Sequence, residues 1–246
     1  VANVLLAAGG SPIMSDDADD VEDITSICGG LNINIGTLNK NTIPSMFLAG
    51  KKANALGHIV LLDPVGAGAS RLRTDTANRL MREVRFDAVR GNISEIKTLC
   101  TGSGSTKGVD ADAVDAVTEA NLDDGVALVK AFAKQTGCII AVTGAIDLVS
   151  DGERCWCIRN GRAEMSRITG TGCQLSALMT AFLVANPDRK LDAAAAAVCM
   201  MGLAGEIGWA NMQPGDGNST YRDRIIDAIF NMTSDALEEG AKYELR

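Results

Sequence analysis

Residues 59–68 read Ile59-Val60-Leu61-Leu62-Asp63-Pro64-Val65-Gly66-Ala67-Gly68 and join an apolar run to a glycine-rich turn. A short run of branched apolar residues that ends at a turn is typical of a strand buried in a parallel sheet. Asp63 would project from the end of this strand, and the glycines would let the backbone approach a ligand closely. A plain glycine turn would explain the same residues, so the segment alone predicts a strand end rather than a binding site.

Short apolar strands alternate with longer helical stretches on both sides of this segment. The alternation predicts βαβ units, and therefore an α/β fold with a mainly parallel sheet and helices on both faces. The expected strands are Leu31–Ile35, Ile59–Leu62, Ala88–Val89, Cys138–Val142, Leu148–Ser150 and Arg154–Ile158. The expected helices are Ala18–Cys28, Ile43–Ala55, Thr74–Glu83, Asn92–Cys100, Asp123–Gln135, Gly172–Ala185, Leu191–Met212 and Arg222–Glu239. The turn Asp151-Gly152-Glu153 predicts an antiparallel hairpin between the last two strands.

A single domain over residues 1–246 is the simplest organisation, because the sequence contains no linker, low-complexity segment or internal repeat. A chain of 246 residues that is 46% hydrophobic can form one sizeable core. The longest apolar run extends from Ala193 to Ala204 and is too short to span a bilayer. We therefore expect no membrane partner.

Charge and composition exclude several classes of function. The net charge is −8 and the sequence has no basic stripe, which argues against a nucleic-acid partner. His58 is the only histidine, which makes a site of several histidine ligands impossible and a Ser-His-Asp triad possible only if it includes His58. The seven cysteines are scattered and lie mostly in apolar runs. This pattern fits a reducing cytoplasm better than a disulfide framework.

Two further segments place polar side chains just after a strand, where open α/β sheets bind ligands. Arg90 follows a short strand and could pair with phosphate oxygens. Asn92 and Glu95 follow it with the spacing of a capping box at a helix start. Thr143 offers a hydroxyl at the end of the strand Cys138–Val142. Helix capping alone would explain Asn92 and Glu95, and a turn alone would explain Thr143.

The strongest single signal is Thr169-Gly170-Thr171-Gly172-Cys173, where two glycines precede a long apolar helix. The free N–H groups and the positive dipole end of such a helix form an anion site. Charge that develops on a transferring phosphoryl group could be stabilised there. Cys173 lies in the first turn, where the helix end is expected to lower the pKa of the thiol. A simple helix-entry turn is the alternative.

Taken together, these segments resemble the ribokinase-like superfamily in order and spacing and, more closely, the hydroxyethylthiazole kinase family. The matching stretches are Gly9-Gly10-Ser11-Pro12-Ile13-Met14, Leu31–Leu38, Leu62–Ala69, Val89–Ile96, Lys107–Asp110, Ala141–Gly144, Asp147 and Thr169–Cys173. The resemblance covers nearly the whole chain and implies a ribokinase-like three-layer sandwich. Relative to that family, the chain is expected to lack the N-terminal strand segment.

The resemblance also implies a reaction: ATP phosphorylates the hydroxyethyl group of 4-methyl-5-(2-hydroxyethyl)thiazole in thiamine salvage, with Mg²⁺ as cofactor. The implied catalytic residues are Cys173, Gly170, Thr171 and Gly172. The implied thiazole-binding residues are Met14, Gly170 and Asp63, the ATP-binding residues are Arg90, Thr143 and Asn92, and the metal-binding residues are Glu95 and Asp63. Cys173 stands where most of the superfamily has Asp, as it does in the thiazole kinases.

The resemblance further implies a cytoplasmic homotrimer with active sites between subunits. Two alternatives stay open at this point. One is another ribokinase-like enzyme, such as a pyridoxal or hydroxymethylpyrimidine kinase or a related ATP-using dehydratase, although Cys173 in place of Asp argues against most of these. The other is a non-catalytic ligand-binding homologue. A methyltransferase or a dehydrogenase is disfavoured, because no Gly-x-Gly-x-x-Gly loop follows the first strand.

Overall fold

The computed structural model describes residues 1–102 and 116–246, so the stretch Lys107–Asp110 lies outside the described residues. Within these residues, seven strands form one sheet in the order of the sequence. They are β1 (Gly30–Asn34), β2 (Ile59–Asp63), β3 (Ala88–Asn92), β4 (Ile139–Thr143), β5 (Asp147–Ser150), β6 (Cys155–Ile158) and β7 (Tyr243–Leu245). Strands β1 to β4 run parallel, and β5, β6 and β7 each pair antiparallel with the preceding strand.

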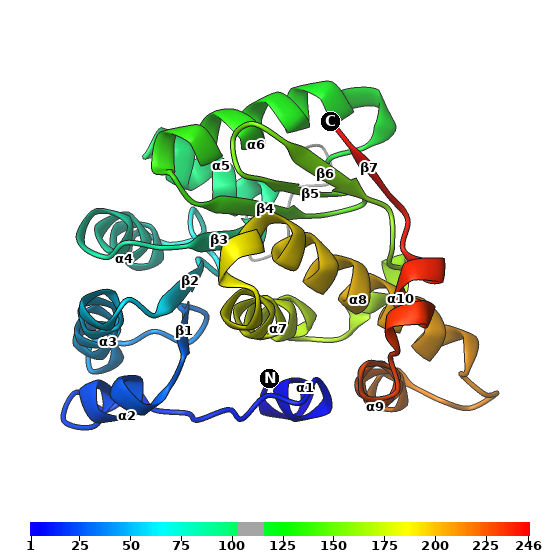
Figure 1. Cartoon of the computed structure of the whole chain (residues 1–246), viewed down its shortest axis with the longest axis horizontal. Helices are drawn as coiled ribbons and strands as arrows, with labels where there is room; N and C mark the ends of the chain where they lie inside the picture. Colours follow the sequence, from blue (N-terminus) through cyan, green and yellow to red (C-terminus); the bar gives the residue numbers. More distant parts are fainter. Residues whose placement is uncertain (103–115) are drawn as a thin grey trace.

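Helices cover both faces of the sheet, as predicted, in a three-layer arrangement (Figure 1). One face carries α3 (Thr42–Leu56), α4 (Arg71–Glu83), α5 (Ile93–Thr101) and α6 (Leu122–Thr136). The other carries α7 (Thr171–Ala185) and α8 (Lys190–Ala210), with α1 (Ala2–Ala7), α9 (Asn218–Phe230) and α10 (Ser234–Gly240) packed outside them. Helix α2 (Val21–Ile27) packs on α3. Successive side chains of a strand point to opposite faces of the sheet. In β2, Val60 and Leu62 therefore pack in the core beneath α3 to α6, and Ile59 and Leu61 pack in the core beneath α7 and α8.

The predicted helix Arg222–Glu239 is wrong as a single element. Helix α9 ends at Phe230 and α10 begins at Ser234. Between them, the Thr233 side chain accepts a hydrogen bond from the N–H of Ala236 at 3.1 Å. Such a side-chain cap starts a new helix and favours a break before it.

Two short elements at the ends of the chain were not predicted, namely α1 and β7. Strand β7 has three residues, which is too few for a periodic pattern to reveal. It is held by its partner: the N–H groups of Cys155 and Arg246 each donate to the other residue's carbonyl at 2.8 Å. The sheet edge therefore depends on pairing with β6 rather than on local propensity.

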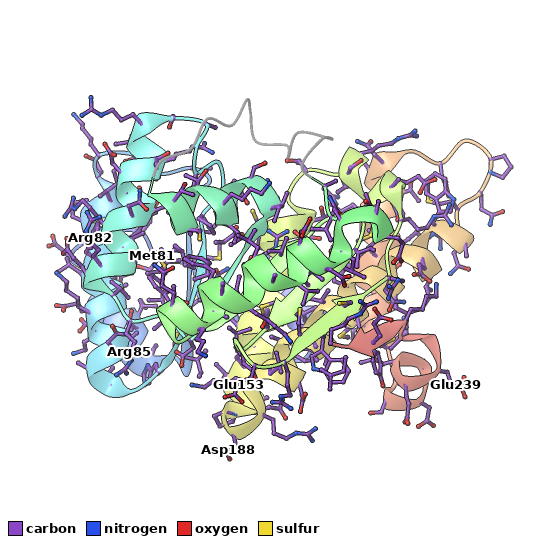
Figure 2. The ribbon with its side chains drawn as sticks, turned by 90° about the horizontal axis from the view of Figure 1, so that it is seen from above. Met81, Arg82, Arg85, Glu153, Asp188 and Glu239 are labelled. Carbon is purple, nitrogen blue, oxygen red and sulfur yellow. The ribbon has the colours of Figure 1, made fainter. Side chains whose placement is uncertain are left out.

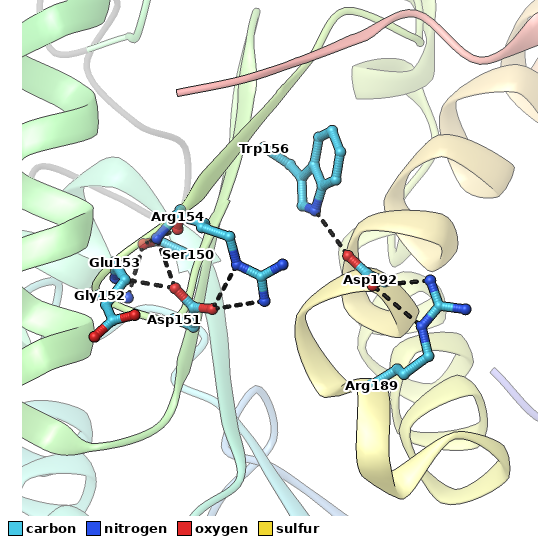
Figure 3. A network of polar contacts seen from close by, with 8 residues as sticks. All are labelled: Ser150, Asp151, Gly152, Glu153, Arg154, Trp156, Arg189 and Asp192. Carbon is cyan, nitrogen blue, oxygen red and sulfur yellow. Dashed lines mark hydrogen bonds and ion pairs between the residues drawn. The ribbon is translucent and has the colours of Figure 1, made fainter.

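The predicted hairpin between β5 and β6 is confirmed, and its turn is closed by side chains (Figure 3). The Asp151 carboxylate accepts from the backbone N–H groups of Glu153 and Arg154 at 2.9 and 2.7 Å. The N–H of Gly152 donates to Ser150 Oγ at 3.0 Å. Gly152 has φ +98°, a left-handed conformation that favours glycine. Asp and Gly therefore fix this turn for the reasons that make them common in turns generally.

Helix α8 is the longest helix in the described residues. The stretch Pro187–Ala210 has the length and composition to cross a membrane, and 72% of its most apolar window is buried inside the protein. At its start, Asp192 accepts a hydrogen bond from Trp156 Nε1 of β6 at 3.2 Å (Figure 3). We assign α8 to the core, because its apolar surface is already covered by the sheet and by α7 and α9.

Two hollows of about 670 and 510 Å³ open at the amino-terminal ends of the parallel strands. They share the lining residues Arg85, Phe86, Thr136 and Cys138. Arg85, Glu153 and Asp188 lie along this edge of the molecule in Figure 2. None of the residues predicted for catalysis or binding lines either hollow, so both are separate from the candidate site at the other end of the strands.

Candidate active site

The carboxyl ends of the four parallel strands bring the predicted polar residues to one edge of the sheet. Asn34 at the end of β1 lies opposite Asp63 at the end of β2. Asn92 at the end of β3 lies opposite Thr143 at the end of β4. Because adjacent strands end in register, these side chains gather at the place where open α/β sheets bind ligands.

Asp63 is the centre of the site, with 0% of its surface exposed. Its Oδ2 accepts from Asn34 Nδ2 at 2.7 Å and from Ser176 Oγ of α7 at 2.9 Å. Its Oδ1 has no hydrogen-bond partner among the described residues, and Arg90 Nη1 lies 3.7 Å from it. Burial raises the pKa of Asp63, and the Arg90 charge and these hydrogen bonds oppose the rise.

Arg90 connects three of the predicted segments. Its Nη2 donates to Thr143 Oγ1 at 2.6 Å, while Nη1 faces Asp63. The guanidinium also lies against the first turn of α7, since a Cβ on Gly172 would stand 2.5 Å from Nη1. The glycine loop, Asp63 and the end of β4 therefore converge on one guanidinium, a group that can pair with phosphate oxygens.

Glu95 holds the loop after β2 against the start of α5. Its Oε1 accepts from the N–H of Gly66 at 2.7 Å, and its Oε2 accepts from the N–H of Asn92 at 2.8 Å. Asn92 Oδ1 in turn accepts from the N–H of Glu95 at 2.8 Å, which completes the predicted capping box. Burial raises the pKa of Glu95, and the negative charge of Asp63 adds to the rise. The capping box therefore explains the bond that Glu95 accepts from Asn92, but not the bond that it accepts from Gly66.

We expect Glu95→Gln to lower the free energy of unfolding by about 1–2 kcal/mol, because the amide would turn a donor toward one of the two buried N–H groups. Urea denaturation followed by circular dichroism measures this change. Glu153→Gln is the matched control, since Glu153 is exposed and its variant should stay within about 0.5 kcal/mol of the unsubstituted chain. Equal stabilities of the two variants would show that the capping box contributes nothing.

Helix α7 begins with its first-turn amides uncapped by any side chain. Gly170 precedes it with φ +85°, in the left-handed region. The expected lowering of the Cys173 pKa is wrong: burial and the negative charge of Asp63 raise it. A hydrogen bond with Asn34 and the charge of Arg90 oppose the rise without outweighing it, so Cys173 is a protonated thiol near neutral pH.

Two other predicted features stand apart from this cluster. Met14 is 74% exposed in the irregular residues 10–17, so a single chain does not bury it in a pocket. Asp147 accepts from the N–H of Gly144 at 2.8 Å and thereby closes the loop after Thr143. Burial raises the pKa of Asp147 to about 7.

Three residues of the site were not predicted from the sequence. Asn34 and Ser176 bind Asp63, and both lie inside stretches whose pattern was recognised without a role for them. Arg73 in the first turn of α4 donates to the carbonyls of Val65 and Gly36 at 3.1 and 2.8 Å, and so joins the loops after β1 and β2. No spacing in the sequence indicates this last role.

Comparison with known proteins decides the family. A family model described as the hydroxyethylthiazole kinase family matches residues 1–235. The chain belongs to the hydroxyethylthiazole kinase family. It is 56% identical over 243 residues to hydroxyethylthiazole kinase of Clostridium acetobutylicum, covering 99% of this chain and 89% of that protein. It is 46% identical over 241 residues to the enzyme of that name from Ruminiclostridium cellulolyticum, covering 98% and 86%.

Solved structures extend the likeness from the hydroxyethylthiazole kinase family to the fold. The hydroxyethylthiazole kinase protein of Pyrococcus horikoshii OT3 superposes with a TM-score of 0.87 at 30% identity, covering 100% of this chain and 88% of that chain. Pyridoxal kinase of Staphylococcus aureus gives a TM-score of 0.61 at 15% identity, covering 99% and 90%. The second likeness shows a shared ribokinase-like fold alone.

Proposed function

We propose that this chain transfers the terminal phosphoryl group of ATP to the hydroxyl of 4-methyl-5-(2-hydroxyethyl)thiazole, as a kinase of thiamine salvage. The observation that carries the proposal is the position of Arg90, which lies between Asp63, Thr143 and the first turn of α7 in a member of this family. Phosphoryl transfer requires positioning and charge stabilisation more than covalent help from the protein. Buried charges around a helix N-terminus supply both.

The backbone of Gly170, Thr171 and Gly172 would bind the transferring phosphoryl group. Its amides have no side-chain cap, and Gly172 leaves room for Arg90 beside them. Arg90 and Thr143 would contact the ATP phosphates. Asn92 uses Oδ1 to cap α5, so its part in ATP binding would be to fix the end of β3 next to Arg90.

Asp63 and Glu95 fit a magnesium ion. Mg²⁺ in phosphoryl-transfer sites takes one or two carboxylates and completes its shell with waters and phosphate oxygens. Asp63 Oδ1 is buried without a hydrogen-bond partner, and the charges of the two carboxylates disfavour each other. No cluster of three or more metal-binding side chains occurs among the described residues, in keeping with a shell completed by water and substrate. When bound, the ion would neutralise charge on the phosphates.

The thiazole pocket would be completed by a second copy of the chain. Met14 and the neighbouring Ile13 are 74% and 49% exposed, an unusual state for two adjacent apolar side chains. We propose a cytoplasmic homotrimer in which a neighbouring subunit covers this segment and Gly170 lines the opposite wall. Light scattering coupled to size-exclusion chromatography tests the assembly, and a monomer at micromolar concentration would contradict it.

The acceptor is tested by ADP release with Mg²⁺, offering the thiazole alcohol, pyridoxal and hydroxymethylpyrimidine separately. We expect turnover with the thiazole alcohol and at least about a hundredfold lower kcat/KM with the other two, because their rings differ in shape and polar groups. Turnover of pyridoxal alone would favour the related vitamin-precursor kinases. Nucleotide binding without turnover of any alcohol would favour a non-catalytic homologue.

We expect Cys173→Ala to lower kcat by about tenfold or less and to leave nucleotide affinity unchanged. A thiol whose pKa is raised is mostly protonated at pH 7–8 and is a poor proton acceptor, so its contribution would be to orient the alcohol. Steady-state kinetics with calorimetric titration of ADP separates the two quantities. A thousandfold loss of kcat would show that Cys173 acts as the base. An unchanged kcat would show that Cys173 takes no part in the chemistry.

A further inference from the structure

The stretch Leu31–Leu38 matches the family, yet the mechanism above gives it no task. Asn34 is its one side chain that reaches Asp63. Its Oδ1 accepts from the N–H of Gly36 at 2.9 Å, and its Nδ2 donates to Asp63 Oδ2 at 2.7 Å. Because a backbone N–H can only donate, the first bond fixes which end of the carboxamide is the acceptor. Nδ2 must then point to Asp63.

Two neutral donors bind the same oxygen of Asp63, and the Cys173 thiol also lies close enough to this carboxylate to lower its pKa. Asn34 and Ser176 reach Oδ2, while Oδ1 has no hydrogen-bond partner in the part of the chain that the structure describes. The nearest guanidinium nitrogen, Arg90 Nη1, stays 3.7 Å from Oδ1, beyond hydrogen-bond distance. The carboxylate is thus held through Oδ2, while Oδ1 faces the positive charge of Arg90 without a hydrogen bond to it.

A buried carboxylate beside a guanidinium ordinarily forms a short, two-pronged ion pair. Asp63 is fully buried and the Arg90 side chain is only 11% exposed, so solvent does not weaken their attraction much. Asp63 is held by the two donors on Oδ2, and Arg90 is held by its bond to Thr143 at 2.6 Å. In a closed ion pair neither charge would be available. Arg90 could not bind phosphate, and Asp63 could not bind a cation.

We infer that Asn34 is a positioning residue for phosphoryl transfer, which, with Ser176, holds Asp63 by Oδ2 and so keeps Asp63 and Arg90 from closing into a short, hydrogen-bonded ion pair. The inference deepens the proposed function and rests on it for the reaction, though not for the identity of the alcohol. A purely structural alternative is that Asn34 only anchors the loop at Gly36. Ser176 distinguishes between these two explanations, because it binds Asp63 but belongs to α7 and not to the loop at Gly36.

The test compares Asn34→Leu with Ser176→Ala. We expect each variant to lower kcat by about ten- to hundredfold, because each removes a hydrogen bond to a buried charged group. We also expect the Mg²⁺ concentration that half-saturates binding of a non-hydrolysable ATP analogue to rise about fivefold or more, measured by calorimetry. In crystals of either variant, the 3.7 Å separation of Arg90 Nη1 and Asp63 Oδ1 should shorten to hydrogen-bond distance.

Two matched controls remove groups of the same kind that form no hydrogen bond with the residues of the site. Asn54 likewise uses both ends of its carboxamide, donating to the Arg85 carbonyl at 2.8 Å and accepting from the Arg85 N–H at 2.7 Å. Ser45 is 2% exposed with a buried hydroxyl in α3. Asn54→Leu and Ser45→Ala should change thermal stability and leave kcat per folded molecule and the Mg²⁺ dependence within twofold of the unsubstituted chain.

The inference is overturned if Ser176→Ala retains full kcat and Mg²⁺ dependence while Asn34→Leu loses activity, since the loop alone would then explain Asn34. The inference is also overturned if both variants only lower the yield of folded protein, with kcat per folded molecule and the Mg²⁺ dependence unchanged. The calorimetric readout needs no acceptor. An unsubstituted chain that binds the analogue with Mg²⁺ but phosphorylates none of the three alcohols would therefore contradict the proposed function. The Mg²⁺ dependence of the Asn34 and Ser176 variants would still test the inference by itself.

Discussion

Gly172→Ala is expected to fold like the unsubstituted chain and to lose nearly all kinase activity. The new Cβ would stand 2.5 Å from Arg90 Nη1 and 2.8 Å from Nη2, so the guanidinium has to move. These atoms are the far end of a flexible side chain, and the helix itself need not shift. Displacing Arg90 from the anion site should lower kcat/KM by about 10²–10³, the usual cost of losing one preorganised charge at a transition state.

Gly172→Val should abolish activity, because the larger side chain would also obstruct the approach of the phosphate. Steady-state kinetics measures the loss, and urea denaturation should show a stability within about 1 kcal/mol for the alanine variant. Gly217→Ala is the control. Gly217 likewise lies at the start of a helix, as the N-cap of α9, has φ −120°, and would place its Cβ with nothing within 4 Å. Full activity in Gly172→Ala would remove the anion site from the first turn of α7.

The sequence predicted those parts of the fold and site that depend on local pattern. Buried strands such as Ile59–Leu62 are short apolar runs that end in turn residues, and glycine before an apolar helix marks the start of α7. Because parallel strands share one carboxyl edge, Asp63, Arg90 and Thr143 could be expected to meet there, and the hydrogen bond from Arg90 to Thr143 bears this out.

The features that the sequence did not reveal depend on contacts between distant segments. The pKa of Cys173 rises because burial and Asp63 act on it, and neither is visible from a position in a first helical turn. Asn34 acquires its role only through the register that sets it opposite Asp63. Likewise, Arg73 becomes a link between two loops only once α4 packs beside them.

Asp63→Asn is expected to lower kcat by about 10²–10³ while leaving the fold at least as stable as before. The substitution keeps the shape of the side chain and can keep the bonds from Asn34 and Ser176. It removes the negative charge that faces Arg90 and that would bind a cation. Preorganised charge in a buried site typically contributes an effect of this size.

The stability of the Asp63→Asn variant follows from the direction of the Asp63 pKa shift. Because burial raises this pKa above its ordinary 3.8, the folded state binds the proton more tightly than the unfolded state does. The stabilising contribution of the protonated carboxyl is complete below pH 3.8 and is lost as the pH rises through the folded value. At pH 8 the unsubstituted chain therefore carries the cost of a buried charge, which the neutral amide of the variant would avoid.

Urea denaturation at pH 8 and at successively lower pH tests this reasoning. The variant should unfold at an equal or higher urea concentration at pH 8, and its advantage should shrink as the pH approaches 3.8. Asp75→Asn is the control, because Asp75 is exposed and its variant should follow the unsubstituted chain at every pH. A variant that is inactive and clearly less stable at pH 8 would mean that Asp63 holds the fold together. One that is inactive and equally or more stable would mean that the fold bears the cost of this buried charge for the sake of catalysis, as active sites commonly do.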